Sequence, residues 1–204
     1  MTIKVVIASR NEHKIDEMRR ILHEAGLSLD LVGIQEFPDL PDVDETGATF
    51  AENALLKARE ICAFTGLPAI ADDSGLCVDA LGGMPGIFSA RWAGTHGNDL
   101  ANLQLLLAQI SHVASDRRTA SFHCAAAIVT PGGAEKVVEG IMAGRIIDTP
   151  RGTNGFGYDP IFIADGYSIT TAEMDSASKD AISHRGLAIA ALAPTLSQLL
   201  SRAT

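Results

Sequence analysis

The chain has 204 residues, which is typical of one domain, and 47% of them are hydrophobic, which argues against disorder. The formal net charge is −9 and only 5% of the residues are aromatic, so the composition conflicts with a basic or stacking surface for nucleic acid. A small polyanion would therefore need a local group of Lys and Arg or a bound metal ion.

The cysteines and the N-terminal segment indicate a compartment. Cys62, Cys77 and Cys124 form no CxxC pair, and their odd number and wide spacing argue against a disulfide framework and a zinc site. The N-terminal segment lacks the layout of a signal peptide, and no apolar run approaches the roughly 20 residues that cross a bilayer. We therefore expect a cytoplasmic protein with no membrane partner.

The first part of the chain alternates strand and helix patterns. Segment 3–8 is apolar and β-branched, typical of a buried strand, and segment 14–25 has apolar residues at helical spacing. Residues 36–49 are rich in Pro and acidic residues, which predicts a surface loop. Thr49 and Glu52 form a capping-box pattern, which predicts a helix to about residue 64.

The rest of the chain adds further strands and helices. A buried strand is predicted over residues 67–71 and ends at a turn over residues 72–75. Further helix and strand patterns occupy residues 98–110, 119–130, 135–147 and 161–164. A last helix begins near His184, and Pro194 should kink or divide it. A Pro-Gly-Gly hairpin turn among βα units predicts an α/β fold with a mixed sheet.

Two segments that carry a lysine are candidates for phosphate binding. The turn over residues 9–14 brings backbone amides and Lys14 to a helix N-terminus, which favours an anion, with Ser9 and Asn11 as further hydrogen-bonding groups. The alternative is an ordinary helix start with a solvated lysine. Lys57 falls on the apolar stripe of its predicted helix, so it either reaches out to water or meets an anion such as phosphate.

Adjacent acids follow the predicted strand 67–71. Open α/β sheets bind ligands beyond the carboxyl ends of their strands, where Asp72 and Asp73 are expected. Because neighbouring residues of an extended backbone point to opposite faces, one carboxylate can bind Mg²⁺ or accept a proton while the other caps local amides. A further carboxylate comes from Asp44 or Glu45. The alternative is a turn with two exposed acids.

Two later segments are candidates for nucleoside binding. Glycines flank Phe156, so the backbone can approach a flat ligand while the ring stacks on a base, and Asp159 can accept a hydrogen bond. The alternative is a tight turn with a core aromatic. Lys179, His184 and Arg185 offer donors for a keto oxygen or a phosphate, or form a helix cap and a surface pair. Together these features favour a nucleoside triphosphate with Mg²⁺ over a macromolecular partner.

Several motifs in one order carry a resemblance to a known family. They are Thr46-Gly47-Ala48-Thr49-Phe50 with Glu52-Asn53-Ala54, Lys57-Ala58, Ala71-Asp72-Asp73-Ser74-Gly75-Leu76, Leu81-Gly82-Gly83 with Pro85-Gly86, Gly155-Phe156-Gly157-Tyr158-Asp159-Pro160 and Ser183-His184-Arg185-Gly186. From residue 3 to about 200 the chain resembles the inosine triphosphatase family, house-cleaning pyrophosphatases for ITP, dITP and XTP. The family's usual Thr-Gly-Asn is here Ser9-Arg10-Asn11.

The resemblance implies a fold, an activity and partners. The fold is an elongated α/β structure whose mixed central sheet is flanked by helices, with two lobes and a cleft between them, and residues 1–204 form a single domain. The activity is Mg²⁺-dependent hydrolysis of a purine nucleoside triphosphate to the monophosphate and pyrophosphate. The partners are this small molecule and a second copy of the chain in a homodimer.

The resemblance also implies roles for individual residues. Asp73 matches the general base and a metal ligand, Glu45 or its neighbour Asp44 matches a further metal ligand, and Ser74 lies beside the substrate. Contacts to the triphosphate and the rest of the substrate are implied for Ser9, Arg10, Asn11, Glu12, His13, Lys14, Lys57 and Lys179. Contacts to the nucleoside and base are implied for Phe156, Gly157, Tyr158, Asp159, His184 and Arg185.

Two other functions compete with this interpretation. One is a nucleotide pyrophosphatase of another base specificity, such as a Maf-like or pyrimidine-directed enzyme, which the base-site motifs disfavour. The other is a non-catalytic nucleotide-binding regulator, which the intact Asp72-Asp73-Ser74-Gly75 motif disfavours.

Overall fold

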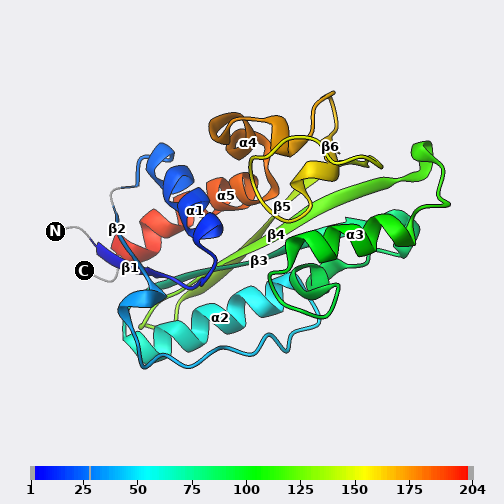
Figure 1. Cartoon of the computed structure of the whole chain (residues 1–204). Helices are drawn as coiled ribbons and strands as arrows, with labels where there is room; N and C mark the ends of the chain where they lie inside the picture. The colour runs from blue at the N-terminus through cyan, green and yellow to red at the C-terminus, as the bar shows by residue number, and fades with distance from the viewer. Residues whose placement is uncertain (1–2, 28, 202–204) are drawn as a thin grey trace. The chain divides into compact units, whose positions relative to one another are not determined.

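A six-stranded sheet is the central feature of the computed structural model, which describes residues 3–27 and 29–201 (Figure 1). Its strands are β1 (Ile3–Ile7), β2 (Leu29–Gly33), β3 (Ala69–Val78), β4 (Thr119–Val129), β5 (Glu135–Ile146) and β6 (Phe162–Ala164). They lie in the order β2-β1-β3-β4-β5-β6. β1 pairs in parallel with β2 and β3, whereas β5 and β6 are antiparallel, so the predicted mixed sheet is confirmed.

The chain forms two compact units. The first unit consists of Met1–Asp73, Cys124–Gly140 and Arg185–Thr204, and the second unit consists of Ser74–His123 and Ile141–His184. Strands β3, β4 and β5 each continue from one unit into the other. The boundaries between the units therefore fall inside strands and not in linkers.

In the first unit, alternation along the strands decides which helix each side chain meets. The helices are α1 (Glu12–Glu24), α2 (Phe50–Thr65) and α5 (His184–Ser201), and Figure 1 shows α2 on the opposite side of the sheet from α1 and α5. Ile70 of β3 packs with side chains of α1 and α5, while its neighbours Ala69 and Ala71 pack with α2. Successive strand residues point to opposite faces, so Asp72 and Asp73 are directed toward different helices.

Local signals place α2 as predicted. The Thr49 hydroxyl accepts a hydrogen bond from the Glu52 N–H at 3.1 Å, and the Glu52 carboxylate accepts one from the Ala48 N–H at 2.7 Å. Gly66 ends the helix in the left-handed region, at φ = 67°, which favours glycine. The predicted start and end of this helix are confirmed.

A separate hydrophobic core fills the second unit. The helices of this unit are α3 (Asp99–Gln109) and α4 (Ser176–Ile182). Its buried core combines apolar side chains of β3, α3, β4 and β6, among them Leu76, Leu106, Phe122 and Phe162. Phe122 meets the Phe162 ring edge-on, with ring centroids 4.8 Å apart. This core stabilises the parts of β3, β4 and β5 that belong to the second unit.

The predicted turn at residues 72–75 is wrong. These residues lie inside the ten-residue strand β3. Gly75 signals a turn in the sequence, but here it allows a close approach: a Cβ at this position would collide with the Gly86 carbonyl and the Ser89 side chain. The two acids therefore lie within a strand and not beyond its end.

Other elements also differ from the predictions. Strand β2 was not predicted, because its sequence Leu-Asp-Leu-Val-Gly is short and lies at the edge of the sheet. Helix α5 begins at His184 as predicted, but it continues as one helix past Pro194 and is not divided. Among the described helices, none is long and apolar enough to span a membrane.

Candidate active site

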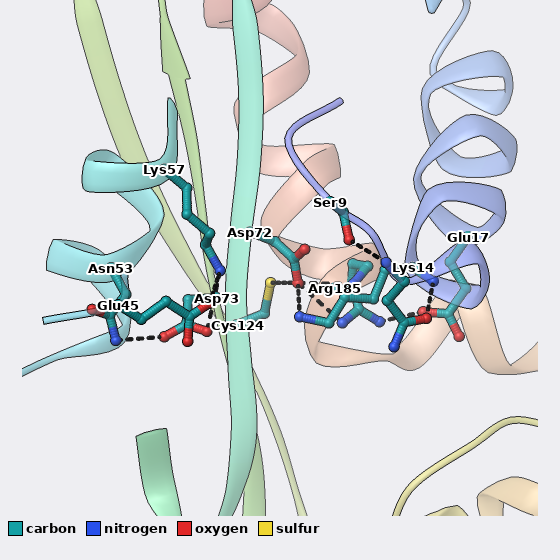
Figure 2. Close-up of polar contacts among 11 residues, drawn as sticks. Ser9, Lys14, Glu17, Glu45, Asn53, Lys57, Asp72, Asp73, Cys124 and Arg185 are labelled. Atoms are coloured by element: carbon teal, nitrogen blue, oxygen red, sulfur yellow. Dashed lines mark hydrogen bonds and ion pairs between the residues drawn. The ribbon is translucent and has the colours of Figure 1, made fainter. Parts of the chain in front are cut away.

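Two polar clusters lie on opposite faces of β3, and Figure 2 shows them on either side of the strand. Asp73 faces α2 and meets Lys57, Glu45 and Asn53. Asp72 faces α1 and α5 and meets Lys14 and Arg185. The prediction that neighbouring carboxylates point to opposite faces is confirmed, although they lie within a strand.

The Asp73 cluster joins a strand, a helix and a loop. Lys57 of α2 places its Nζ 2.8 Å from Glu45 Oε1 and 3.5 Å from Asp73 Oδ1. Asn53, one turn earlier in α2, donates a hydrogen bond from Nδ2 to Asp73 Oδ2 at 3.0 Å. Lys57 therefore does not reach out to solvent: its side chain is 13% exposed and pairs with two carboxylates.

Electrostatics differ between the members of this cluster. Burial raises the pKa of Asp73, and Glu45 raises it further, although Lys57, Lys14 and the Asn53 hydrogen bond act against this shift. Burial would lower the pKa of Lys57, but the charges of Asp73 and Glu45 outweigh it and raise the pKa. Lys57 thus stays protonated, while Asp73 is a carboxylate with enhanced basicity, as a general base requires.

The same cluster suits a divalent cation. Within residues 3–27 and 29–201, no three His, Cys, Asp or Glu side chains are arranged to hold a metal ion on their own. Mg²⁺, however, commonly binds one or two carboxylates together with waters and substrate phosphates. Glu45 and Asp73 supply two carboxylates beside one lysine, whereas Asp44 is exposed. The residues present therefore fit such an ion, and Glu45 is the member of the acidic pair that accompanies Asp73.

The Asp72 cluster is a buried ion network. Lys14 Nζ lies 3.2 Å from Asp72 Oδ2, and Arg185 contacts the same oxygen through Nε at 3.2 Å and Nη2 at 3.0 Å. Arg185 also donates from Nη1 to Glu17 of α1. The Cys124 thiol of β4 lies 4.0 Å from Asp72 Oδ2.

Two neighbouring cations lower the pKa of Asp72. Burial would raise its pKa, but Lys14 and Arg185 hold the pKa well below its usual range. Burial likewise opposes the charge of Arg185, yet Asp72 and Glu17 raise its pKa. Asp72 is therefore a permanently charged anchor for two cations and is unsuited to accept a proton near neutral pH.

The turn before α1 organises its own backbone. Asn11 caps the helix by accepting the Lys14 N–H at 3.2 Å, and Ser9 Oγ accepts the Asn11 N–H at 3.2 Å. Arg10, where the resembled family usually has glycine, pairs at the surface with Asp42 Oδ1 at 2.7 Å. Glu12 and His13 are also exposed. Of the predicted turn residues, Lys14 is the one that joins the cluster at Asp72.

In the second unit, Asp159 organises the glycine-rich loop. Its Oδ2 accepts the Phe156 N–H at 2.9 Å and pairs with Lys179 Nζ at 2.6 Å, and its Oδ1 accepts the Thr171 hydroxyl at 2.8 Å. Lys179 also lies 5.2 Å from the centre of the half-buried Phe156 ring. The structure therefore brings together three predicted substrate residues, Phe156, Asp159 and Lys179.

The remaining residues of this loop have structural contacts. The Tyr158 hydroxyl donates to the Ser89 carbonyl at 2.9 Å, and burial raises the pKa of this tyrosine. The Gly157 N–H donates to the Asp99 carboxylate of α3 at 2.8 Å. These contacts fix the loop, and the nucleoside contacts of both residues stay predictions.

The consecutive residues His184 and Arg185 belong to different units. His184 stacks on Phe122, with ring centroids 4.8 Å apart and an angle of 11° between the planes. Arg185 is 1% exposed and binds Asp72 and Glu17 of the first unit. Ser74, the first residue of the second unit, is half-buried on β3. The base contacts of His184 and Arg185 stay predictions.

Sequence reasoning assigned no role to Glu17 or Asn53. Glu17 lies three residues after Lys14, on the same side of α1, and a charge among the buried positions of a helix is a weak sign of a partner. Asn53 belongs to the Glu52-Asn53-Ala54 motif, but an asparagine in a helix has many structural uses. Their partners Arg185 and Asp73 lie far away in sequence, so only the tertiary structure identifies these contacts.

The fold and the two clusters define a class: an α/β protein equipped to bind a phosphorylated small molecule, with half-buried lysines and neighbouring carboxylates. Residues 5–195 match the model of the Ham1 family, and the chain belongs to this family. The resemblance drawn from the motifs is thereby confirmed.

Individual relatives cover nearly the whole chain. A dITP/XTP pyrophosphatase of Streptomyces avermitilis is 58% identical over 197 residues, which are 97% of this chain and 98% of the relative. The crystal structure of a nucleoside-triphosphatase, or dITP/XTP pyrophosphatase, from Mycobacterium abscessus shares 53% identity with a TM-score of 0.76, over 95% of this chain and 100% of that chain. A HAM1 protein from Coxiella burnetii shares 42% identity with a TM-score of 0.86, over 97% and 100% of the two chains.

Proposed function

We propose that this chain hydrolyses the non-standard purine nucleoside triphosphates ITP, dITP and XTP to the monophosphate and pyrophosphate. The observation that carries the proposal is Asp73, a buried carboxylate with a raised pKa, held beside Lys57 and Glu45. Relatives that bear the name dITP/XTP pyrophosphatase and share more than half of the residues support the substrate class.

Asp73 acts as the general base of this reaction. It accepts a proton from a water molecule while the water oxygen forms a new bond to the α-phosphorus. The anhydride bond between the α- and β-phosphates breaks. Pyrophosphate leaves with the electron pair of that bond. An aspartate with a raised pKa holds the proton from water more strongly than an ordinary aspartate does, which makes it a better base in such a step.

Lys57 and Lys14 bind the phosphates of the substrate. Lys57 is protonated and positioned at the base, so it can neutralise charge on a phosphate oxygen as the anhydride bond breaks. Lys14 stands in the first turn of α1, where the backbone amides and the helix dipole also favour an anion. Asp72 and Glu17 fix the cations of that face.

Mg²⁺ is the proposed cofactor, with Glu45 and Asp73 as its protein ligands. Bound there, the ion would supply positive charge that offsets the charge of the phosphates. Lys57, paired with both carboxylates, limits the net negative charge of the two ligands when the ion is absent.

Recognition of the purine base is proposed for Phe156, His184 and Arg185. Phe156 can stack on a purine, and His184 can donate to the C6 keto oxygen of hypoxanthine or xanthine. For Arg185, this role requires its guanidinium to exchange Asp72 or Glu17 for the base. A site built on donors rejects adenine, whose C6 amine would leave buried donors unpaired.

The Arg185→Ala variant tests base recognition. We expect its kcat/KM to fall far more for ITP than for ATP, while the ratio of ITP to GTP stays nearly constant because guanine shares the C6 keto group. Steady-state kinetics with the three nucleotides measure this. Equal proportional losses for ITP and ATP would limit Arg185 to its contacts with Asp72 and Glu17.

We further propose that residues 1–204 act as one pyrophosphatase domain in a cytoplasmic homodimer. Large apolar side chains are exposed in the second unit, among them Phe88 at 41% and Leu100 at 66%, and a partner subunit would cover such side chains. Light scattering of the purified protein measures the oligomeric state.

A pyrophosphate-release panel tests the activity. It compares ITP, XTP, ATP, GTP and their deoxy forms, each with and without Mg²⁺. Release from ITP and XTP in excess over ATP and GTP, and only with Mg²⁺, is the expected outcome. Release confined to other bases would indicate a different specificity, and binding without release would indicate a nucleotide-binding regulator.

A further inference from the structure

Asn53 is a fully buried amide whose two ends hold two different parts of the Asp73 cluster. Its Nδ2 donates to Asp73 Oδ2 at 3.0 Å, and its Oδ1 accepts the Gly47 N–H at 2.7 Å. A carboxylate only accepts and a backbone N–H only donates, so the two partners fix the orientation of the amide. One side chain thus links β3 to the loop that carries Glu45.

Gly47 makes this link possible. A Cβ at this position would lie 2.6 Å from Asn53 Oδ1 and 2.7 Å from the Glu52 Cβ, closer than real contacts allow. The loop therefore approaches α2 at a distance that only glycine permits, two residues after Glu45.

The link determines the geometry of both carboxylates. Asn53 takes Asp73 Oδ2, which leaves Oδ1 directed at Lys57 at 3.5 Å. The bond to Gly47 holds the loop where Glu45 Oε1 lies 2.8 Å from the same Lys57 nitrogen. Without Asn53, the Asp73 carboxylate keeps its contact with Lys57 but loses the bond that fixes Oδ2. The Glu45 loop then loses its bond at Gly47 and keeps the bonds of Glu45 to Lys57 and of Ala48 to Glu52.

We propose that Asn53 is a positioning residue that fixes the Asp73 and Glu45 carboxylates as a pair for a divalent cation and for the reacting water. This inference rests on the proposed function of the Asp73 cluster. Groups that orient metal ligands typically contribute 10- to 100-fold in metal affinity or activity, and a misplacement of about 1 Å can cost about 100-fold in rate.

Two substitutions at Asn53 and one control at Asn102 test the proposal. Asn53→Ala removes the amide, and Asn53→Leu removes it at similar volume. Asn102 of α3 is a matched control because it is 1% exposed, accepts the Ala93 N–H at 2.7 Å and donates to the Ala90 carbonyl at 3.1 Å. Asn102→Ala therefore breaks the same number of side-chain hydrogen bonds of a buried amide without touching a carboxylate.

Two measurements are made on each folded variant. The first is kcat and KM for ITP with Mg²⁺, and the second is Mn²⁺ affinity without nucleotide, followed by the electron paramagnetic resonance signal of free Mn²⁺. Both Asn53 variants should lose about 10- to 100-fold in kcat and in Mn²⁺ affinity, with KM within about threefold of the wild type. Asn102→Ala should leave all three values near wild type, although its stability falls.

Wild-type kcat and Mn²⁺ affinity in both Asn53 variants would overturn the proposal, and so would an equal loss in Asn102→Ala. If the Asn53 variants do not fold, Gly47→Ala, which crowds the amide oxygen, must reproduce both losses. Failure of the proposed function is seen separately, as a wild-type protein that releases no pyrophosphate; the Mn²⁺ comparison still decides the role of Asn53 in that case.

Discussion

Asp72 and Asp73 are neighbours on one strand and are almost equally buried, at 1% and 5% exposed, yet their pKa values shift in opposite directions. Asp72 faces two cations in direct contact, Lys14 and Arg185. Asp73 is in contact with Lys57, a cation that it shares with a second carboxylate, Glu45. Burial alone therefore does not decide the role of a carboxylate. The balance of charges on each face of β3 makes one acid an anchor and leaves the other able to accept a proton.

The largest expected effect comes from Asp73→Asn. Removing the base and a metal ligand while keeping the volume should lower kcat by about 10²- to 10⁴-fold and leave the protein folded. Pyrophosphate release from ITP measures the rate, and circular dichroism checks the fold. A folded variant that keeps more than about a third of the wild-type kcat would contradict the assignment of Asp73 as the base.

Asp72→Asn should mainly lower the free energy of unfolding. It leaves Arg185 and Lys14 buried without their shared carboxylate, and breaking a buried ion pair in this way typically costs about 3–5 kcal/mol. Urea unfolding of variant and wild type measures the difference. A variant of unchanged stability would show that the ion network at Asp72 is not the anchor that its contacts suggest.

The pH dependence of stability should separate the two faces further. Because the pKa of Asp72 is lower in the folded than in the unfolded chain, its contribution is complete above the unfolded value of about 3.9 and is lost as the pH falls below it. The pKa of Asp73 is raised in the folded chain, so its contribution to the stability of the fold increases as the pH falls. Wild type should therefore lose stability as the pH falls from about 4 to about 2, and Asp72→Asn should flatten this loss. Equal slopes for the two proteins would argue against a lowered pKa at Asp72.

Lys57→Met should have a smaller effect than loss of the base. Methionine suits the helix and keeps an unbranched side chain, but the charge beside Glu45, Asp73 and the incoming phosphate is lost. A charge-assisted hydrogen bond contributes about 1.5–3 kcal/mol, so kcat/KM should fall about 10- to 100-fold, through both a higher KM and a lower kcat. Steady-state kinetics with ITP measure it, and unchanged constants in a folded variant would reduce Lys57 to a structural partner of Glu45 and Asp73.

The smallest expected effect concerns Cys124, the uncharged member of the Asp72 face. Burial raises the pKa of its thiol to about 12, and the charge of Asp72 acts in the same direction. Only the thiolate reacts with alkylating reagents, so Cys124 should remain unmodified at pH 8 in the folded protein. Mass spectrometry after iodoacetamide treatment, with the unfolded protein as control, measures this. Rapid modification of Cys124 would show that the face is more open than the structure indicates.

Several features could be predicted from the sequence because they depend on neighbours along the chain. The Thr49 cap and the stop at Gly66 fix the ends of α2 through local backbone bonds. Alternation along an extended backbone was enough to predict opposite directions for Asp72 and Asp73. Motifs that follow one another in order were enough to identify the family.

Other features depend on contacts between distant segments. Gly75 looks like a turn residue in the sequence, but the Gly86 carbonyl and Ser89 pack against it and the strand continues. Lys57 is paired and not solvated because Glu45, 12 residues away, returns to it. The sequence alone therefore determined which residues carry charge and which helix and strand patterns present them. Only the tertiary structure decided which charges meet, and the sum of those charges sets the pKa of each acid on β3.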